Sequence, residues 1–285
     1  MTLSSHLPKY KQCCTLQRML FSLRQLKLLF EVAKFNALKM LAYPWELVAF
    51  FIQRFIGLFF LALFWFAVSQ SSTTLQSFRS LIAYFLVASA VRDLTFSYNM
   101  KFGSGLLKMI KSGEITNYLI KPISSIPFLF FAFVGQTWMS LVYSTFTLIA
   151  GLIILPPLGI INYLAFIVFC ILAFIVSISC NLLVGIVSFY VVEAGGIKNM
   201  FNHIIRILSG ALIPLTLFPE MMRTLTLLSP FPLFAFTPTY VLQNALSWRE
   251  LTQLFAISLF WAIGLFFTMT YLWKRALKQY EGIGI

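Results

Sequence analysis

Few side chains in this sequence could do chemistry. The 285 residues include two histidines, His6 and His203, and eight carboxylates. His203 has no second imidazole or carboxylate at the spacing of a metal site, so both histidines are interpreted as surface or capping residues. The sequence has no GxxxxGK[ST] motif for binding nucleotide phosphates and no GxSxG nucleophile motif. We therefore expect no catalytic residue, no metal site and no cofactor bound by this chain.

Charged residues within or beside the apolar runs are a second kind of candidate. They are Arg54, Arg92, Asp93 and Glu193. Charges at membrane depth are usually paired or face a polar cavity. Asp93 adjoins Arg92, whereas Arg54 could snorkel towards the inner surface or meet the carboxylate of Asp93 or Glu193. Two interpretations stay open for this group, a buried structural ion pair and a gate or conformational latch.

The composition is that of an integral membrane protein. Hydrophobic residues make up 60% of the chain and charged residues only 10%, against about 25% charged residues in soluble domains. The net charge of +13 comes from Lys and Arg gathered at the two ends and in one internal segment. That distribution follows the positive-inside rule, with attraction to anionic lipid headgroups as a secondary effect, so we expect no nucleic-acid partner.

Apolar runs predict an all-α protein with six transmembrane helices. A span needs about 20 residues to cross the hydrocarbon. The predicted spans are Leu47–Ser69, Ser80–Tyr98, Pro127–Ile154, Ile161–Val192, Ile204–Phe218 and Leu251–Trp273. The basic segments 1–46, 101–124 and 274–285 alternate with uncharged connectors, so both termini are expected in the cytosol.

Flanking regions complete the predicted organisation. Residues 1–15 are expected to form a disordered tail, residues 16–46 an amphipathic helix along the inner leaflet, and residues 274–285 a basic cytosolic tail after the transmembrane domain of residues 47–273. Four prolines break the apolar segment 219–248. It is predicted to form two short helices that dip back into the outer leaflet, because broken backbone is tolerated where protein covers it; the alternative is an ordinary external loop.

The segment 101–124 differs from an ordinary connector because it has helical periodicity. One apolar cluster is formed by Leu106, Leu107 and Ile110, and a second by Ile115, Tyr118 and Leu119. Gly113 is expected to break the helix between them. The segment either docks into a groove on a soluble partner or rests on the bilayer.

This segment also carries a family resemblance. Residues 110–124, with their pattern of Ile, basic residue, Gly113 and Lys121-Pro122, resemble a loop of the membrane (permease) subunits of type-2 ATP-binding-cassette exporters, in the ABC-2-like branch. Three further stretches resemble that branch in the same order: Ser209–Leu215 with Phe218-Pro219, Pro230-Phe231 with Pro238, and Trp273–Tyr280 followed by Gly282. The similarity covers roughly residues 25–285.

The resemblance implies a non-catalytic export subunit in the bacterial cytoplasmic membrane. Two permeases, as a homodimer or heterodimer, would rest on separate ATPase subunits that bind ATP and Mg²⁺. Residues 101–124 would hold the coupling helix, residues 16–43 an elbow helix and residues 219–248 the re-entrant helices. The implied ATPase-coupling residues are Leu106, Leu107, Ile110, Lys111, Glu114, Ile115, Tyr118 and Leu119.

The substrate is expected to be hydrophobic or amphiphilic, because the spans carry mainly Phe, Leu, Ser and Thr. A membrane-embedded enzyme acting on lipid or peptide is one alternative. An ATP-independent channel or scaffold is another. A neighbouring gene for a protein with Walker A and signature motifs would favour the exporter over both.

Overall fold

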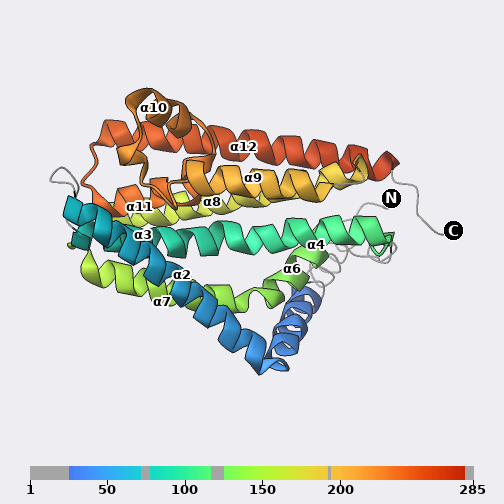
Figure 1. The fold of residues 1–285 in the computed structure, drawn as a ribbon. Helices are drawn as coiled ribbons and strands as arrows, with labels where there is room; N and C mark the ends of the chain where they lie inside the picture. Colours follow the sequence, from blue (N-terminus) through green and yellow to red (C-terminus); the bar gives the residue numbers. More distant parts are fainter. Residues whose placement is uncertain (1–25, 72–77, 117–124, 192–193, 280–285) are drawn as a thin grey trace, which may run out of the picture.

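Helices alone make up the regular structure of the described part of the chain. The computed structural model describes residues 26–71, 78–116, 125–191 and 194–279 (Figure 1). The predicted tail 1–15, and Tyr118, Leu119 and Glu193, lie outside these ranges. The α-helices are α2 (Pro44–Ser71), α3 (Phe78–Arg92), α4 (Tyr98–Ser112), α6 (Ser125–Gln136), α7 (Trp138–Ile154), α8 (Ile160–Ile186), α9 (Ala194–Leu208), α10 (Glu220–Leu228), α11 (Phe236–Gln243) and α12 (Trp248–Gln279).

One long helical rod passes through the bundle. Helix α3 continues through a π-helical turn, η1 (Asp93–Ser97), directly into α4, and the three form one line in Figure 1. The predicted second span, Ser80–Tyr98, is therefore too short, and the helix expected before Gly113 continues it without a connecting loop. The rod continues past two glycines because their missing side chains allow neighbouring helices to approach, which compensates for their low helix propensity.

The predicted break at Gly113 is confirmed. Helix α4 ends at Ser112, and Gly113 adopts a φ of 75°. This left-handed conformation costs glycine nothing and other residues about 1–2 kcal/mol, so it ends the helix here. The Ile115 amide then donates to the Met109 carbonyl, which turns the chain back over the end of the rod.

The predicted third span is bent. Helices α6 and α7 meet at Thr137 at an angle of 62°. The Thr137 hydroxyl donates to the Phe133 carbonyl within α6, an interaction that bends helices by competing with their own backbone hydrogen bonds. The chain turns at Pro156-Pro157, since α7 ends at Ile154 and α8 begins at Ile160.

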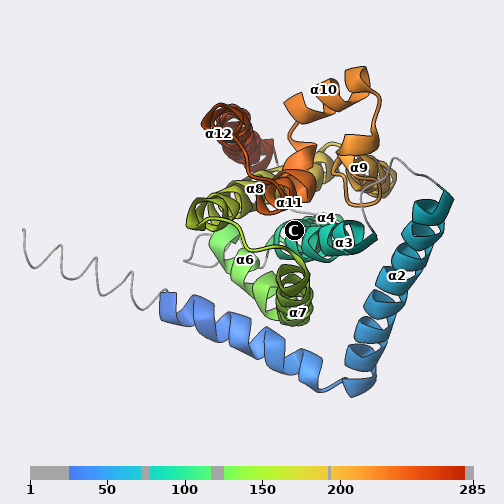
Figure 2. The same ribbon diagram turned by 90° about the vertical axis from the view of Figure 1, so that its left-hand side faces the viewer.

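Helix α8 is the central element of the core. It packs against the rod on one side and against α12 and α11 on others (Figure 2). At one end of the bundle, α4, α6, α8 and α12 share a cluster of buried apolar side chains. We call this the basic end, because it holds Lys108, Lys111 and the Lys274-Arg275 pair. The predicted fourth span ends earlier than Val192, since α8 stops at Ile186 and a 3-10 turn, Val187–Phe189, follows.

The predicted fifth span, Ile204–Phe218, is wrong as one helix. Helix α9 ends at Leu208, and Gly210 follows with a φ of 79°. The Tyr84 hydroxyl of α3 donates to the Gly210 carbonyl at 2.7 Å, and Pro214 precedes a single 3-10 turn. A left-handed glycine and a proline together end the helix, although the apolar sequence continues.

Two short helices, as predicted, occupy the proline-rich segment. They are α10 and α11, separated by a 3-10 turn at Phe231–Phe234. Phe234 and Phe236 are fully buried, so this segment is part of the core rather than a solvated loop. The Asn162 side chain of α8 donates to the Val241 and Asn244 carbonyls at 2.9 and 3.0 Å, which satisfies the end of α11. Its location in the outer leaflet stays a prediction.

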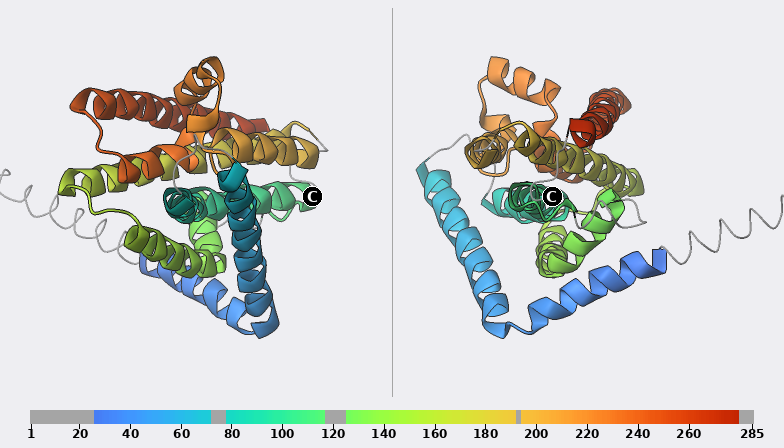
Figure 3. Two further views of the ribbon diagram at one scale, coloured as in Figure 1. Left: turned by 60° about the vertical axis from the view of Figure 1, so that its left-hand side comes forward. Right: turned by 90° about the vertical axis from the view of Figure 1, so that its right-hand side faces the viewer.

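Helix α2 and the helix before it project from the bundle, although the earlier of the two packs on α6, where Ala33 lies against Gly135. Residues 26–41 are helical and meet α2 at a sharp corner, and α2 diverges from the bundle towards that corner (Figure 3). Most of their large apolar side chains are exposed. This agrees with the predicted amphipathic helix feeding the first span, and its location on the inner leaflet stays a prediction.

Among the described residues, three helices are long and apolar enough to cross a membrane, namely those within Pro44–Gln70, Ile160–Val187 and Trp248–Lys278. The bent pair α6 and α7 makes a fourth if it forms one span. The last helix extends beyond the predicted Leu251–Trp273 at both ends. A count of six also needs α3 and α9, which have 15 residues each, and so stays a prediction.

Close contact between the rod and α8 gives a test of the fold. A Cβ at Gly103 of α4 would lie 2.5 Å from the Asn181 carbonyl oxygen of α8, whereas a Cβ at Gly264 of α12 would meet nothing within 4 Å. We expect Gly103→Ala to destabilise the protein by about 1–3 kcal/mol, as overpacking does. The control Gly264→Ala should be neutral or slightly stabilising, because Ala is the better helix former. Thermal unfolding of the two variants in detergent measures the difference; equal unfolding midpoints would contradict this packing.

Candidate functional site

An ion pair joins α2 to the rod. The Arg54 Nη1 atom donates to the Asp93 Oδ1 atom at 2.9 Å. Asp93 is fully buried, and 24% of the Arg54 side chain is exposed. Of the partners that the sequence left open for Arg54, the structure selects Asp93. Removing one member of such a pair is costly because the other charge remains in a medium of low dielectric constant.

The position of the ion pair on the rod is unusual. Asp93 is the first residue of the π-helical turn η1. Such turns are rare, appear mostly inside α-helices and are frequent at functional sites. The widened turn interrupts the regular backbone ladder where the carboxylate is held, so the rod is most easily bent or twisted at the residue that contacts α2.

Aromatic rings surround the guanidinium of Arg54. Its Cζ atom lies 5.3 Å from the Phe50 ring centroid and 5.7 Å from that of Tyr143 on α7. A cation at this distance is attracted by the ring electrons. The rings restrict the water around Arg54 and strengthen its attraction to Asp93, so the pair connects α2, α7 and the rod.

Arg206 on helix α9 is a basic residue that the sequence analysis missed. Arg92, next to Asp93, lies within electrostatic range of Arg54, Asp93 and Arg206. Neither Arg92 nor Arg206 forms a salt bridge with another described residue. Arg206 could have been found from the sequence, because Lys198, Asn202 and Arg206 recur every four residues and so share one face of the helix.

The polar face of α9, formed by Lys198, Asn202 and Arg206, lies beside the rod. The Lys198 ammonium donates to the Ser104 hydroxyl of α4 at 3.0 Å, and Arg206 is close to Arg92 at the other end of this face. Between them, the Asn202 Oδ1 atom is buried and has no hydrogen-bond partner among the described residues. Basic and amide groups therefore follow the rod from the basic end up to the ion pair.

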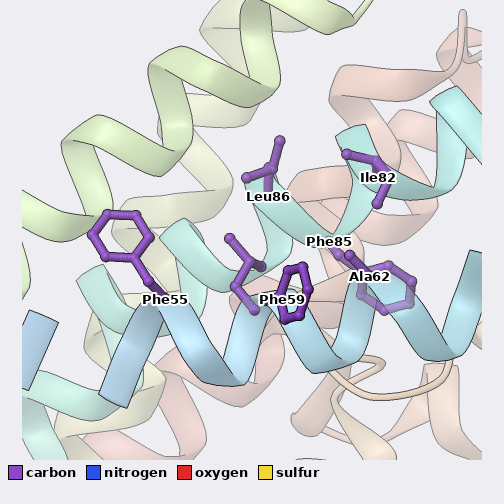
Figure 4. Close-up of a pocket in the computed structure, with 7 residues that line it drawn as sticks. Phe55, Phe59, Ala62, Ile82, Phe85 and Leu86 are labelled. Atoms are coloured by element: carbon purple, nitrogen blue, oxygen red, sulfur yellow. The ribbon is translucent and has the colours of Figure 1, made fainter. Parts of the chain in front are cut away.

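A second contact holds the far end of α2. The Trp65 ring is 4% exposed and stacks on Phe85 of α3, with ring centroids 5.4 Å apart. Between Trp65 and Arg54, the two helices enclose a cavity of about 350 Å³ (Figure 4). Its lining is wholly apolar and consists of Phe55, Leu58, Phe59, Ala62, Ile82, Phe85 and Leu86. Helix α2 is thus held by the rod at two points, with a hollow between them.

The apolar residues predicted to couple to an ATPase are located in the interior of this chain. Leu106, Leu107, Ile110 and Ile115 are buried, and three of them join the core cluster at the basic end. Within this chain, Leu106, Ile110 and Ile115 pack against α6, α8 and α12. Their burial does not favour the expected role as anchors that face a partner, and that role stays a prediction. The helical periodicity of the segment reflects this internal packing, which sequence alone could not distinguish from docking.

The polar residues of the same segment are at the surface. Lys108, Lys111, Ser112 and Glu114 are exposed at and near the end of α4. We call these four residues the tip of the rod. Lys111 and Glu114 are among the coupling residues that the family resemblance implies, and their exposure allows that role. Tyr118 and Leu119 follow the tip in the sequence.

Comparison with known proteins identifies the family. A search among curated proteins finds no match. A protein-family profile described as "ABC-2 family transporter protein" matches residues 55–284, from the start of the cavity lining on α2 to the end of the chain. The match includes the rod, the polar face of α9 and both short helices. The chain therefore belongs to the ABC-2 transporter family and is a multi-pass membrane permease, a transport subunit of the kind that typically works with an ATP-binding-cassette ATPase.

Proposed function

We propose that this chain is the transmembrane subunit of an ATP-driven exporter in a bacterial cytoplasmic membrane. It pairs with a second permease, identical or similar, and both termini are cytosolic. A separate ATPase binds ATP and Mg²⁺ and drives alternating access for a hydrophobic or amphiphilic substrate. The observation that carries the proposal is the rod, which connects the exposed tip to the ion pair of Arg54 and Asp93.

The rod is long and stiff enough to transmit movement. Asp93 and Ser112 are 19 positions apart, or about 28 Å along a helix with a rise of 1.5 Å per residue. The intervening helix packs closely on α8 through Gly103 and Gly185. A displacement of the tip is therefore carried to η1 and to α2, rather than absorbed by a flexible loop.

The tip is the proposed docking surface for the ATPase. It carries both charge signs, with Lys108 and Lys111 on the helix and Glu114 just beyond Gly113. The buried residues Leu106, Ile110 and Ile115 fix it to the core from within. We further propose that Tyr118 and Leu119 supply the apolar part of the contact, as the family resemblance implies.

Helix α2 is the element that this movement would reposition. None of the residues in its 18-residue membrane-spanning window is buried within the chain. Its contacts with the bundle include those towards one end, around Arg54 and Phe55, and those towards the other, around Trp65 and Phe66. An element with few internal contacts moves at low energetic cost. The ion pair is thus proposed to act as a latch whose release separates the inner part of α2 from the rod. Glu193 stays a candidate member of the latch.

Reversing the charge of the tip tests docking. We expect Lys111→Glu combined with Glu114→Lys to reduce co-purification of the ATPase about tenfold or more, because like charges then face each other across the interface. Tyr118→Asp with Leu119→Asp should have the same effect by placing charge in the apolar contact. Pull-down of the tagged permease from membranes measures the bound ATPase.

Arg249→Glu is the matched control for the tip, because Arg249 is exposed at the start of α12, at the opposite end of the bundle. It should bind the ATPase as the wild type does. Unchanged ATPase recovery with both tip variants, at normal membrane insertion, would exclude this surface as the docking site.

The latch is tested by comparing single and double changes. We expect Asp93→Asn to lower substrate-coupled ATP turnover and to destabilise the protein by about 3–5 kcal/mol, because it leaves the Arg54 charge without its carboxylate. Arg54→Met with Asp93→Leu removes both charges and should restore stability. ATP turnover of the reconstituted complex and thermal unfolding are measured on the same samples.

The double variant separates a latch from a structural pair. A latch requires the double variant to be stable yet uncoupled, whereas Arg54→Lys, which keeps a cation beside Asp93, should retain most of the coupling. Full coupling in the stable double variant would show that the pair serves packing alone.

A further inference from the structure

The cavity between α2 and α3 has the size and chemistry of a ligand site for an apolar group. Its volume of about 350 Å³ falls within the ~300–1,000 Å³ range of small-molecule pockets. Residues at every third or fourth position of both helices line it, and all of their side chains are apolar (Figure 4). Phe55 and Phe59 are also largely exposed, so the cavity opens sideways rather than into the core.

Charged groups lie at one end of this cavity. Phe55, at the edge of the lining, directly follows Arg54 in the sequence, and Leu86 precedes Asp93 by seven residues, or about 10 Å of helix. Trp65 and Phe85 close the other end with a stacked pair. A ligand with its apolar part in the cavity would therefore present its polar end to the ion pair.

The charge at that end is positive. Around the single carboxylate of Asp93, the described residues place Arg54, Arg92 and Arg206, with Lys198 further along the same face of α9. Asp93 pairs with Arg54, which leaves Arg92 and Arg206 without a salt bridge among the described residues. Two neighbouring arginines beside an apolar cavity favour an anion, because each guanidinium gains from a charge-assisted hydrogen bond.

Basic residues at the surface of a membrane protein attract anionic headgroups in general. The basic residues of α9 differ from these in the direction in which they face. Ile197, Met200, Ile204 and Ile207 form the exposed apolar face of α9. Lys198 reaches across to Ser104 of the rod, and Arg206 lies near Arg92. Lys198 is thus turned towards α4, and Arg206, an exposed residue, lies within electrostatic range of Arg92 on α3.

We infer that this groove binds an anionic amphiphile, with an acyl chain in the cavity of α2 and α3 and an anionic headgroup against Arg92 and Arg206. Amphiphiles of this class are the cargo. This assignment rests on the export function proposed above, whereas the proposed binding does not depend on it.

Binding is measured on the full chain in nanodiscs of phosphatidylcholine, which has no net charge. The probe is radiolabelled dodecyl phosphate, and retention by empty nanodiscs is subtracted. We expect saturable binding that weakens with added salt, because exposed charges are screened. Dodecyl maltoside and inorganic phosphate should each compete at least about tenfold less well, since one lacks the charge and the other the chain.

Two variants test the two halves of the site. Arg206→Gln should weaken dodecyl phosphate binding about tenfold, as the loss of one charge-assisted hydrogen bond does, and the exposed Arg249→Gln should leave it unchanged. Ala62→Trp fills the cavity and should abolish saturable binding, while Ala256→Trp, at an exposed position of α12, should not. Size-exclusion chromatography checks the folding and assembly of each variant.

Several results would overturn the inference. Equal affinity for dodecyl maltoside would exclude the anionic requirement, and equal competition by inorganic phosphate would exclude the amphiphile. Dissociation of a dimer by Ala62→Trp, without loss of dodecyl phosphate binding, would show that a second copy fills the cavity. Arg206 lies outside the cavity, so Arg206→Gln still tests the inference if Ala62→Trp fails to fold.

The cargo assignment has its own readout. Dodecyl phosphate should stimulate ATP turnover about twofold or more in a reconstituted complex with the ATPase, and Arg206→Gln should raise the concentration required. Binding without any stimulation would make the amphiphile a resident lipid and overturn the cargo assignment. Failure of the ATPase to associate would instead contradict the proposed export function and leave the binding result intact.

Discussion

Close packing of one long helical rod against α8 is the constraint on which the rest of the structure depends. Backbone groups inside a membrane must be satisfied by their own helix, and Gly103 and Gly185 let the two helices approach to near backbone contact. Because the rod runs unbroken from Phe78 to Ser112, it connects the tip to one wall of the apolar cavity, and the π-helical turn between them is the point at which it bends most easily.

Helix α2 has the opposite character. It is apolar along its length, and its contacts with the bundle include the ion pair of Arg54 and Asp93 towards one end and the stacked ring of Trp65 towards the other. The first contact is polar and strong only while both charges are present, and the second is apolar. The cavity between them allows a ligand, rather than the protein itself, to complete the packing. The arginines of the rod and of α9 make the site prefer a negatively charged ligand.

Several features could be predicted from the sequence because they follow from local patterns. The membrane class follows from composition, Gly113 ends its helix because the chain needs a left-handed residue there, and the prolines of 219–248 force two short helices. The helix predicted before Gly113 is present, but its continuity with the second span was missed, because polar residues on a helix do not show whether the helix ends at the membrane or extends beyond it. The prediction of the fifth span was wrong because the apolar sequence continues past Gly210, whereas the helix has already ended.

Sequence by itself determined that this chain is a helical membrane protein with few ionisable groups at depth, and family-specific patterns identified it as a permease. The tertiary structure alone decided which carboxylate Arg54 meets, that Leu106 and Ile110 face inward, and that Arg206 joins Arg92. The physical reason is the separation along the sequence of the residues that decide each feature. Composition, helix termination and turn formation depend on residues within a few positions of one another, whereas ion pairing and burial depend on which helix faces are brought together across tens or hundreds of residues.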